Sequence, residues 1–246
     1  MKRALVTGAT KGIGFGIAKM LLMEGYFVTI TYSRNEEAAR VCRKVLGEIS
    51  DNFEVIRASQ SNEKEISELV KHLRKKETID CIVCNAGISV RGHITEVTNE
   101  LWHEVFQTNL TSHFYIIRDL FDIIPSNSRI IFIGSQMGIH PHAMSLPYGV
   151  SKAATHAFAL NLVKFFEYTG TTVNVIAPGF IETEWHINKP AFIRNNIENK
   201  VALHRFGTIE EIVSVVKIII HNGAINGAVI NIDGGYCYGD NDRTSE

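Results

Sequence analysis

A tyrosine and a lysine stand four residues apart in Tyr148-Gly149-Val150-Ser151-Lys152, at the start of the longest apolar helical pattern in the chain. In a helix, side chains at this spacing project from the same face, so an ammonium would lie beside a phenol. A phenol with an ordinary pKa of about 10 is a poor acid and a poor base near neutral pH, and a neighbouring cation stabilises the phenolate. The pair is therefore a candidate for moving a proton to or from a substrate oxygen. Many solvated helix faces carry the same pair, so the rest of the chain must decide.

Short apolar runs alternate with amphipathic helical patterns along the chain, which predicts a parallel sheet covered by helices on both faces. We expect strands at 3–7, 26–32, 53–58, 79–84, 129–135, 172–177 and 228–232, and helices at 12–23, 36–49, 63–76, 99–124, 148–168 and 209–221. This order indicates one α/β domain of Rossmann type, residues 1–235, with a doubly wound seven-stranded sheet. The stretch 178–206 reads as irregular, and 236–246 as a polar, frayed C-terminal tail.

Composition favours a small-molecule role. The 246 residues are 45% hydrophobic and carry a formal net charge of -1, which gives no reason to expect a nucleic acid or a membrane surface as partner. The N-terminus shows no signal peptide and no apolar run reaches membrane-spanning length, so we expect a cytoplasmic protein. Cys81 and Cys84 lie inside a predicted buried strand and are interpreted as core residues. His140 and His142 have no evident third ligand nearby, and we predict no metal site.

A glycine-rich segment, Thr7-Gly-Ala-Thr-Lys-Gly-Ile-Gly14, joins the first strand to the first helix. Glycines at such a turn let backbone N–H groups and the positive end of the helix approach a pyrophosphate, which predicts a dinucleotide site. Arg34 comes directly after the second strand, about 20 residues further on, where NAD sites usually offer an acidic residue. With Lys11 inside the loop, two cations suit the 2'-phosphate of NADP, although Glu36 and Glu37 leave NAD open.

Other polar or small residues follow the ends of predicted strands, where ligands bind in open α/β sheets. Asn85-Ala86-Gly87 follows the fourth strand, Ser135 ends the fifth, and Pro178-Gly179 follows the sixth. Asn109 falls inside a helical pattern where an amide is a mediocre choice, which indicates a local kink or a water ligand.

Together these segments resemble the short-chain dehydrogenase/reductase family over nearly the whole chain. The resemblance rests on T-G-A-T-K-G-I-G at 7–14, N-A-G at 85–87, Asn109, Ser135, Y-G-V-S-K at 148–152, N-V-I-A-P-G at 174–179, Thr183, and D-G-G at 233–235. The second half is most similar to bacterial β-ketoacyl-(acyl carrier protein) reductases, through P-G-F-I-E-T-E at 178–184 and V-A-L-H-R-F-G at 201–207, before a helix that Thr208 would cap. Ser59 stands where the family often has an aspartate, and the segment 136–147 lacks motifs of that subgroup.

The resemblance implies a catalytic tetrad. Tyr148 would be the general acid, Lys152 would lower its pKa and hold the nicotinamide ribose, Ser135 would hold the carbonyl oxygen, and Asn109 would anchor a water of a proton relay. The residues implied in cofactor binding are Gly8, Thr10, Lys11, Gly12, Ile13, Gly14, Arg34, Ser59, Asn85, Ala86, Gly87, Tyr148, Lys152, Pro178, Gly179, Ile181 and Thr183.

The implied activity is reduction of a ketone to a secondary alcohol with NADPH, on a 3-oxoacyl thioester of acyl carrier protein or CoA, as in fatty acid or polyketide biosynthesis. Two alternatives are an NAD(P)-dependent alcohol, sugar or polyol dehydrogenase, and a non-catalytic nucleotide-binding sensor or subunit. The family also implies a homodimer or homotetramer and a substrate lid at about 180–206. In that lid, Trp185 and Phe192 either contact substrate or pack a short helix. Its basic residues either face an acidic carrier protein or are solvated: Lys189, Arg194, Lys200 and Arg205.

Overall fold

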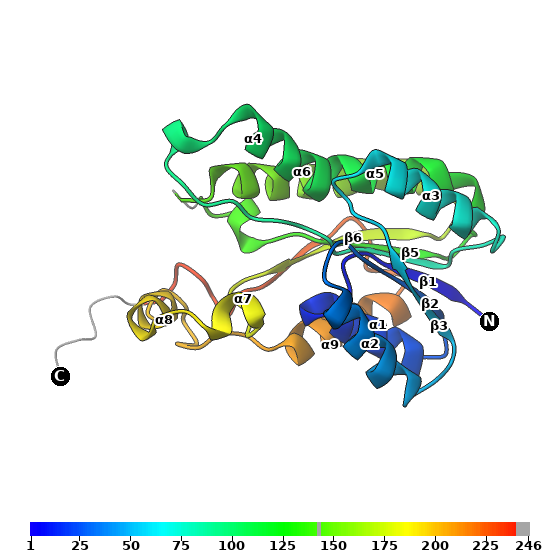
Figure 1. The fold of residues 1–246 in the computed structure, drawn as a ribbon, viewed down its shortest axis with the longest axis horizontal. Coiled ribbons are helices and arrows are strands. Elements are labelled where there is room, and N and C mark those ends of the chain that lie inside the picture. Colours follow the sequence, from blue (N-terminus) through cyan, green and yellow to red (C-terminus); the bar gives the residue numbers. More distant parts are fainter. Residues whose placement is uncertain (142–143, 240–246) are drawn as a thin grey trace.

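Seven parallel strands form the centre of the computed structural model, which describes residues 1–141 and 144–239 (Figure 1). The strands are β1 (Arg3–Val6), β2 (Phe27–Tyr32), β3 (Phe53–Arg57), β4 (Cys81–Cys84), β5 (Arg129–Ile133), β6 (Thr172–Pro178) and β7 (Val229–Ile232). Their spatial order is β3-β2-β1-β4-β5-β6-β7. The predicted doubly wound, seven-stranded Rossmann-type domain is therefore confirmed. Because successive strands are added on one side of β1 up to β3 and on its other side from β4 onward, a ligand crevice is expected at the carboxyl ends of β1 and β4.

Helices cover both faces of the sheet, which explains why the central strands are apolar without alternation. The helices are α1 (Gly12–Met23), α2 (Glu36–Gly47), α3 (Glu63–Arg74), α4 (Asn99–Phe106), α5 (Ser112–Leu120), α6 (Leu146–Leu162), α7 (Glu184–Ile187), α8 (Ala191–Glu198) and α9 (Ile209–His221). Figure 1 shows α3, α4, α5 and α6 in one layer and α1, α2 and α9 in the other, with α7 and α8 extending to one side. Each layer buries its own apolar cluster against the sheet.

The long helix predicted at 99–124 is interrupted. A π-helical turn, η2 (Gln107–Thr111), separates α4 from α5, and a short 3₁₀ turn, η3 (Phe121–Ile123), follows α5. Asn109 lies inside the π-helical turn, so the kink expected from its amide is confirmed. Such turns widen the helix and redirect backbone carbonyl groups, and they are frequent at functional sites.

Two other predicted boundaries shift. The helix expected at 148–168 begins at Leu146, because Pro147 fits a first helical turn, and it gives way at Val163 to a 3₁₀ turn, η5 (Val163–Phe166). The stretch 178–206, predicted to be irregular, contains α7 and α8. The predicted cap of the last helix is confirmed, since Thr208 accepts from the Glu211 amide in a reciprocal capping box.

The expectation that the chain frays from residue 236 is wrong for residues 236–239. Tyr236 is buried and packs with Phe180, Val201 and Phe206 in a small apolar cluster beside the lid. The amides of Cys237 and Gly239 donate to the Lys200 carbonyl. A large aromatic side chain therefore anchors the segment that composition alone marks as polar. The remainder of the predicted tail, 240–246, lies outside the described residues.

The cysteines of the C-x-x-C sequence are core residues, as predicted. Cys81 and Cys84 are fully buried in β4, and burial raises the pKa of the Cys81 thiol to about 12. Within 1–141 and 144–239, no helix combines the length and apolarity needed to cross a membrane.

Candidate active site

The glycine-rich segment and the segment after β4 are fastened to each other at the predicted crevice. The Thr7 hydroxyl accepts from the amides of Asn85 and Ala86, both at 3.0 Å. The Asn85 side chain in turn donates to the carbonyls of Thr7 (2.8 Å) and Gly8 (2.9 Å). Gly8 and Gly12 adopt φ values of 60° and 59°, a region that favours glycine. At Gly8 a Cβ would also lie only 2.9 Å from the Ala86 Cα. Glycine is therefore required at this position both by the backbone conformation and by the lack of space for a side chain.

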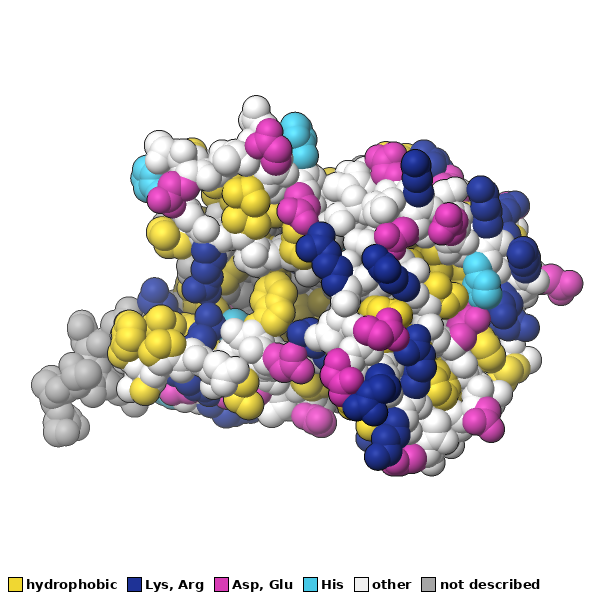
Figure 2. Space-filling view, in the orientation of Figure 1, with side chains coloured by type: hydrophobic (Ala, Val, Ile, Leu, Met, Phe, Trp, Pro, Cys, Tyr) yellow, Lys and Arg dark blue, Asp and Glu magenta, His cyan; other side chains and the backbone are white. Residues whose placement is uncertain are grey.

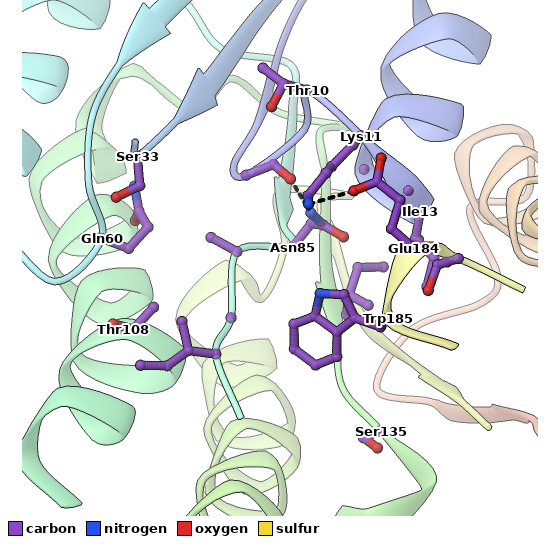
Figure 3. Close-up of a pocket in the computed structure, with 18 of the residues that line it drawn as sticks. Thr10, Lys11, Ile13, Ser33, Gln60, Asn85, Thr108, Ser135, Glu184 and Trp185 are labelled. Carbon is purple, nitrogen blue, oxygen red and sulfur yellow. Dashed lines mark hydrogen bonds and ion pairs between the residues drawn. The ribbon is translucent and has the colours of Figure 1, made fainter. Parts of the chain in front are cut away.

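A cleft of about 510 Å³ opens above these two segments (Figure 3). All seventeen residues implied in cofactor binding line this cleft, from Gly8 in the glycine-rich segment to Thr183 before α7. Three members of the implied catalytic tetrad line it as well, and Asn109 does not. Other lining residues were not predicted: Ser33, Asn35, Ala58, Gln60, Ser61, Ile88, Glu104, Thr108, Ile133, Gly134, Glu184, Trp185 and His186.

The predicted tyrosine and lysine share one face of α6. The Lys152 Nζ lies 5.7 Å from the centre of the Tyr148 ring and donates to the Ile133 carbonyl at 2.6 Å. Lys152 is only 3% exposed, and burial lowers its pKa to about 8. We expected Lys152 to lower the pKa of Tyr148, but burial raises that pKa, with a hydrogen bond from Ser135 acting in the opposite direction. The lysine points to the carbonyl of β5 instead of the phenol oxygen, which explains the difference.

Asn109 lies behind the cleft wall and holds that wall in place. Its Oδ1 accepts from the Ile88 amide at 2.8 Å, and its Nδ2 donates to the Ile88 carbonyl and to the Ser151 hydroxyl, both at 2.9 Å. Both amide hydrogens are therefore used by protein atoms. The backbone carbonyl of Asn109 accepts from the Thr155 hydroxyl at 3.1 Å. A water could bind Asn109 only through a remaining lone pair of its side-chain oxygen or of its backbone carbonyl oxygen.

The model of the family described as short chain dehydrogenase matches residues 2–194 of this chain. The chain belongs to this family. As a member it is an oxidoreductase.

Curated relatives include 3-oxoacyl-(acyl-carrier-protein) reductases. That of Buchnera aphidicola is 32% identical over 240 residues, covering 95% of this chain and 96% of the relative. That of Aquifex aeolicus is 30% identical over 239 residues, with the same coverage of 95% and 96%. The predicted likeness to this subgroup of the short-chain dehydrogenases is therefore confirmed.

Solved structures of the family superpose closely on this chain. A short-chain dehydrogenase of Burkholderia cenocepacia in complex with NADP is 26% identical, with a TM-score of 0.90 and coverage of 95% of this chain and 97% of that one. A short-chain dehydrogenase/reductase of Serratia marcescens is also 26% identical with a TM-score of 0.90, covering 96% and 98%.

Two buried histidines that sequence reasoning missed flank the lysine of this short-chain dehydrogenase. His156 Nε2 accepts from the Ser135 amide at 3.3 Å, and burial, followed by the Lys152 charge, lowers the His156 pKa to about 4. The fully buried His113 has its pKa lowered to about 3 by the same two causes in the same order. Both imidazoles are therefore neutral at pH 7. His156 stands four residues after Lys152, a spacing that could have revealed it.

The far end of the cleft carries one of the two cations expected to bind a 2'-phosphate. Arg34 is exposed, lines the cleft, and forms no ion pair with any residue in 1–141 or 144–239. Lys11 instead contacts Glu184 at the start of α7, at 2.7 Å (Figure 3). The carboxylates that left NAD open have other partners, since Glu36 binds Arg43 and Glu37 binds Arg40.

Helix α7, in the segment 180–206 for which the family resemblance implies a lid, contributes an aromatic side chain to the site. Figure 3 shows the Trp185 indole projecting into the cleft. Substrate contact stays a prediction for Trp185, which lines the cleft, whereas Phe192 is 67% exposed and does not line it. Of the four lid cations, Arg194 is paired with Glu182, and Arg205 contacts Glu211 at 2.6 Å.

The two histidines considered as metal ligands do not form a described site. His140 lies 6.1 Å from the Tyr236 ring, and His142 lies outside the described residues. Over residues 1–141 and 144–239, no three potential ligands among His, Cys, Asp and Glu come together.

Proposed function

We propose that this chain reduces a ketone to a secondary alcohol with NADPH, and that a 3-oxoacyl thioester of acyl carrier protein or CoA is its substrate. The observation that carries the proposal is that Ser135, Tyr148 and buried Lys152 meet on one wall of the cleft. In such a reduction the carbonyl carbon gains a hydride and the carbonyl oxygen gains a proton. A protein that only bound nucleotides would have no chemical need for this group of residues.

The cleft fits a dinucleotide. Its floor is a glycine turn that a Cβ would fill, beside the N-terminus of α1, and both features favour a pyrophosphate. Gly8 to Gly14 would hold the pyrophosphate, Arg34 the 2'-phosphate, and Lys152 the nicotinamide ribose. When bound, NADPH supplies the hydride. The relative from Burkholderia cenocepacia, solved with NADP, supports this cofactor.

The proton is the contribution of the chain itself. Burial raises the pKa of Tyr148, so its hydroxyl stays protonated near pH 7 and can donate to the substrate oxygen. The Ser135 hydroxyl accepts from the Met137 amide at 3.1 Å, so its own hydrogen can turn from Tyr148 to the same substrate oxygen. A lysine with a pKa of about 8 is mostly protonated at pH 7 and keeps a positive charge below the ring. This protonation pattern provides the proton donor that reduction of a ketone requires.

The thioester part of the proposal rests on the curated relatives, which are named 3-oxoacyl-(acyl-carrier-protein) reductases. Docking of an acidic carrier through the lid is limited, because carboxylates already neutralise Arg194 and Arg205. Lys189 and Lys200 remain available for such a contact.

The proposed reaction is tested by following NADPH absorbance with acetoacetyl-CoA as substrate. We expect Tyr148→Phe to lower kcat by at least about 100-fold, the usual range of general-acid contributions, with NADPH affinity retained. Tyr168→Phe is the matched control, because Tyr168 is 97% exposed and does not line the cleft. Turnover by Tyr148→Phe at the wild-type rate would refute the assigned role, and tight NADPH binding without turnover of any ketone would favour a nucleotide-binding sensor or subunit.

Cofactor choice is tested at Arg34. Replacing Arg34 by Leu should weaken NADPH binding by about 10-fold or more, the typical worth of a charge-assisted hydrogen bond, and should leave NADH binding nearly unchanged. Arg40→Leu is the control, because Arg40 is paired with Glu37 on α2 and does not line the cleft. Equal losses for NADPH and NADH in Arg34→Leu would count against a 2'-phosphate contact.

We also propose a homodimer or homotetramer that works in the cytoplasm. Apolar side chains on the outer face of α5 and of the segment after α6 are exposed, among them Phe114 at 42% and Phe165 at 70%. Cys42, Cys81 and Cys84 are buried free thiols, as expected in a reducing compartment. Light scattering on Phe165→Asp should give a smaller assembly than the wild type, and an unchanged mass would exclude this face as the interface.

A further inference from the structure

A second hollow, of about 350 Å³, adjoins the cofactor cleft and shares Ser135 and Tyr148 with it. Two basic residues line this hollow: Arg91, from the loop after β4, and Lys189, from the segment between α7 and α8. These two segments are about 100 residues apart in the sequence, so the fold brings their charges together. Figure 2 shows Lys and Arg side chains bordering the hollowed face between the upper helices and the lid.

No described carboxylate neutralises these two cations. Neither Arg91 nor Lys189 forms an ion pair within residues 1–141 and 144–239. The three acidic residues of the adjacent lid are already engaged, Glu182 and Glu198 by Arg194 and Glu184 by Lys11. The hollow therefore combines two positive charges with no compensating negative charge among its lining residues.

The positive charges of the hollow help to lower the pKa values of two groups that line it. Burial, followed by the charges of Lys189 and Arg91, lowers the pKa of His186 to about 4, and burial followed by Arg91 lowers the pKa of Lys189. His186 is therefore neutral at pH 7 and able to hydrogen-bond a ligand without adding charge. Met137, Phe180 and Trp185 form an apolar part of the wall, and Ser89, Gln136 and Ser145 add uncharged polar side chains.

We propose that this hollow binds an anionic group of the ketone substrate, a carboxylate or a phosphate, between Arg91 and Lys189. The inference rests on the proposed reduction at Tyr148. It goes beyond the 3-oxoacyl thioester proposed above, because it selects ketones that carry an anionic group near the reacting carbonyl. Because the hollow is small and includes Ser135 and Tyr148, the anion and the reacting carbonyl belong to the same short molecule or the same end of a longer one. A short oxo acid, a phosphorylated ketone, or a thioester whose acyl chain ends in a carboxylate has this chemistry, whereas an unsubstituted 3-oxoacyl chain does not.

Matched pairs of ketones test the proposal. Acetoacetate is compared with ethyl acetoacetate, and dihydroxyacetone phosphate with dihydroxyacetone, each with NADPH and the full chain. We expect a higher kcat/KM for the anionic member of at least one pair, and the pair that shows it identifies carboxylate or phosphate. In Arg91→Gln and Lys189→Gln the ratio of anionic to neutral kcat/KM should fall by about 10- to 100-fold, the worth of a hydrogen bond to a charged group. Lys164→Gln, an exposed lysine on η5, is the control in which the ratio stays constant.

A binding measurement separates failure of the inference from failure of the proposed function. Acetoacetate and dihydroxyacetone phosphate are titrated by calorimetry into the enzyme saturated with NADP⁺, which cannot reduce them. Binding that depends on Arg91 and Lys189 would support the anion site even if no ketone were reduced. Reduction of neutral ketones as well as or better than their anionic partners, with ratios unchanged in both variants, would overturn the anion site and leave the reductase assignment standing. Absence of both binding and preference would also overturn it.

Discussion

Substitution of Gly14 by alanine is expected to damage the site for a geometric reason. Gly14 lies in the first turn of α1, and a Cβ there would stand 2.5 Å from the Asn85 Nδ2 and 2.9 Å from the Ala9 Cα. The Asn85 amide is not free to move, because it donates to two carbonyls of the glycine-rich segment. The new methyl group must therefore displace backbone or break these hydrogen bonds.

The expected loss of stability in Gly14→Ala is the sum of three contributions to the free energy of unfolding. Overpacking of this kind costs about 1–3 kcal/mol, and each disrupted hydrogen bond about 1 kcal/mol. Replacing a helical glycine by alanine returns up to about 1 kcal/mol, because the unfolded chain loses conformational freedom. We expect Gly14→Ala to lower the free energy of unfolding by about 2 kcal/mol or more, which for a chain of this size lowers Tm by about 4–8 °C.

Gly47 provides the matched control. It is the last residue of α2, and a Cβ there would have no atom within 4 Å. Gly47→Ala should therefore be neutral or stabilising by up to about 1 kcal/mol. Urea denaturation and an NADPH fluorescence titration on both variants give the comparison, with weakened NADPH binding expected for Gly14→Ala alone. A Gly14→Ala protein as stable as Gly47→Ala, with unchanged NADPH affinity, would refute the reasoning.

Two further predictions concern buried groups away from the reacting atoms. The pKa values of His113 and His156 are lowered by burial from 6.5 to about 3 and about 4, so the unfolded chain binds protons more readily. The contribution of these two histidines to stability is therefore full above about pH 6.5 and falls towards pH 4, by about 1.4 kcal/mol per pH unit for each histidine. Urea denaturation at pH 7 and pH 5 should show a smaller difference for His113→Leu than for the wild type, and equal differences would contradict the linkage. Tyr236→Ala should make the lid susceptible to limited proteolysis and lower the free energy of unfolding by about 3 kcal/mol, as for other large buried aromatics. Tyr238→Ala should do neither, because Tyr238 is 81% exposed. Equal protease resistance of the two variants would contradict the anchoring role of Tyr236.

The fold and the cofactor cleft could be predicted because their determinants are local. Glycine and asparagine segments at strand ends must come together at one edge of a parallel sheet, whatever the packing details. The same applies to Tyr148 and Lys152, which are neighbours by helical spacing alone. The predicted cofactor residues therefore line one cleft in the structure.

What the sequence did not predict depends on contacts between distant segments. The pairing of Lys11 with Glu184 spans 173 residues, and nothing in either neighbourhood indicates it. Tyr236 anchors a segment of polar composition only because Phe180 and Phe206 form a surface for it. The direction of the Lys152 ammonium was also misjudged, since helical spacing places two side chains on one face without fixing what each contacts.

The contact between His156 and the end of β5 constrains the order in which this protein can evolve. A Cβ on Gly134 would stand 2.2 Å from His156 Nε2, and a Cβ on Gly138 would stand 2.8 Å from His156 Cε1. With the imidazole present, any side chain at Gly134 or Gly138 overlaps with it, so substitution of either glycine disrupts the packing around His156. If a smaller residue first replaces His156, a Cβ on Gly134 loses its two nearest obstacles and keeps a 2.8 Å contact with Val175 Cγ1, whereas Gly138 stays closed by the backbone nitrogen of Ala153 at 2.8 Å. Gly134 and His156 should therefore depend on each other in evolution, so that a side chain next to Ser135 is tolerated better after His156 has become smaller than before.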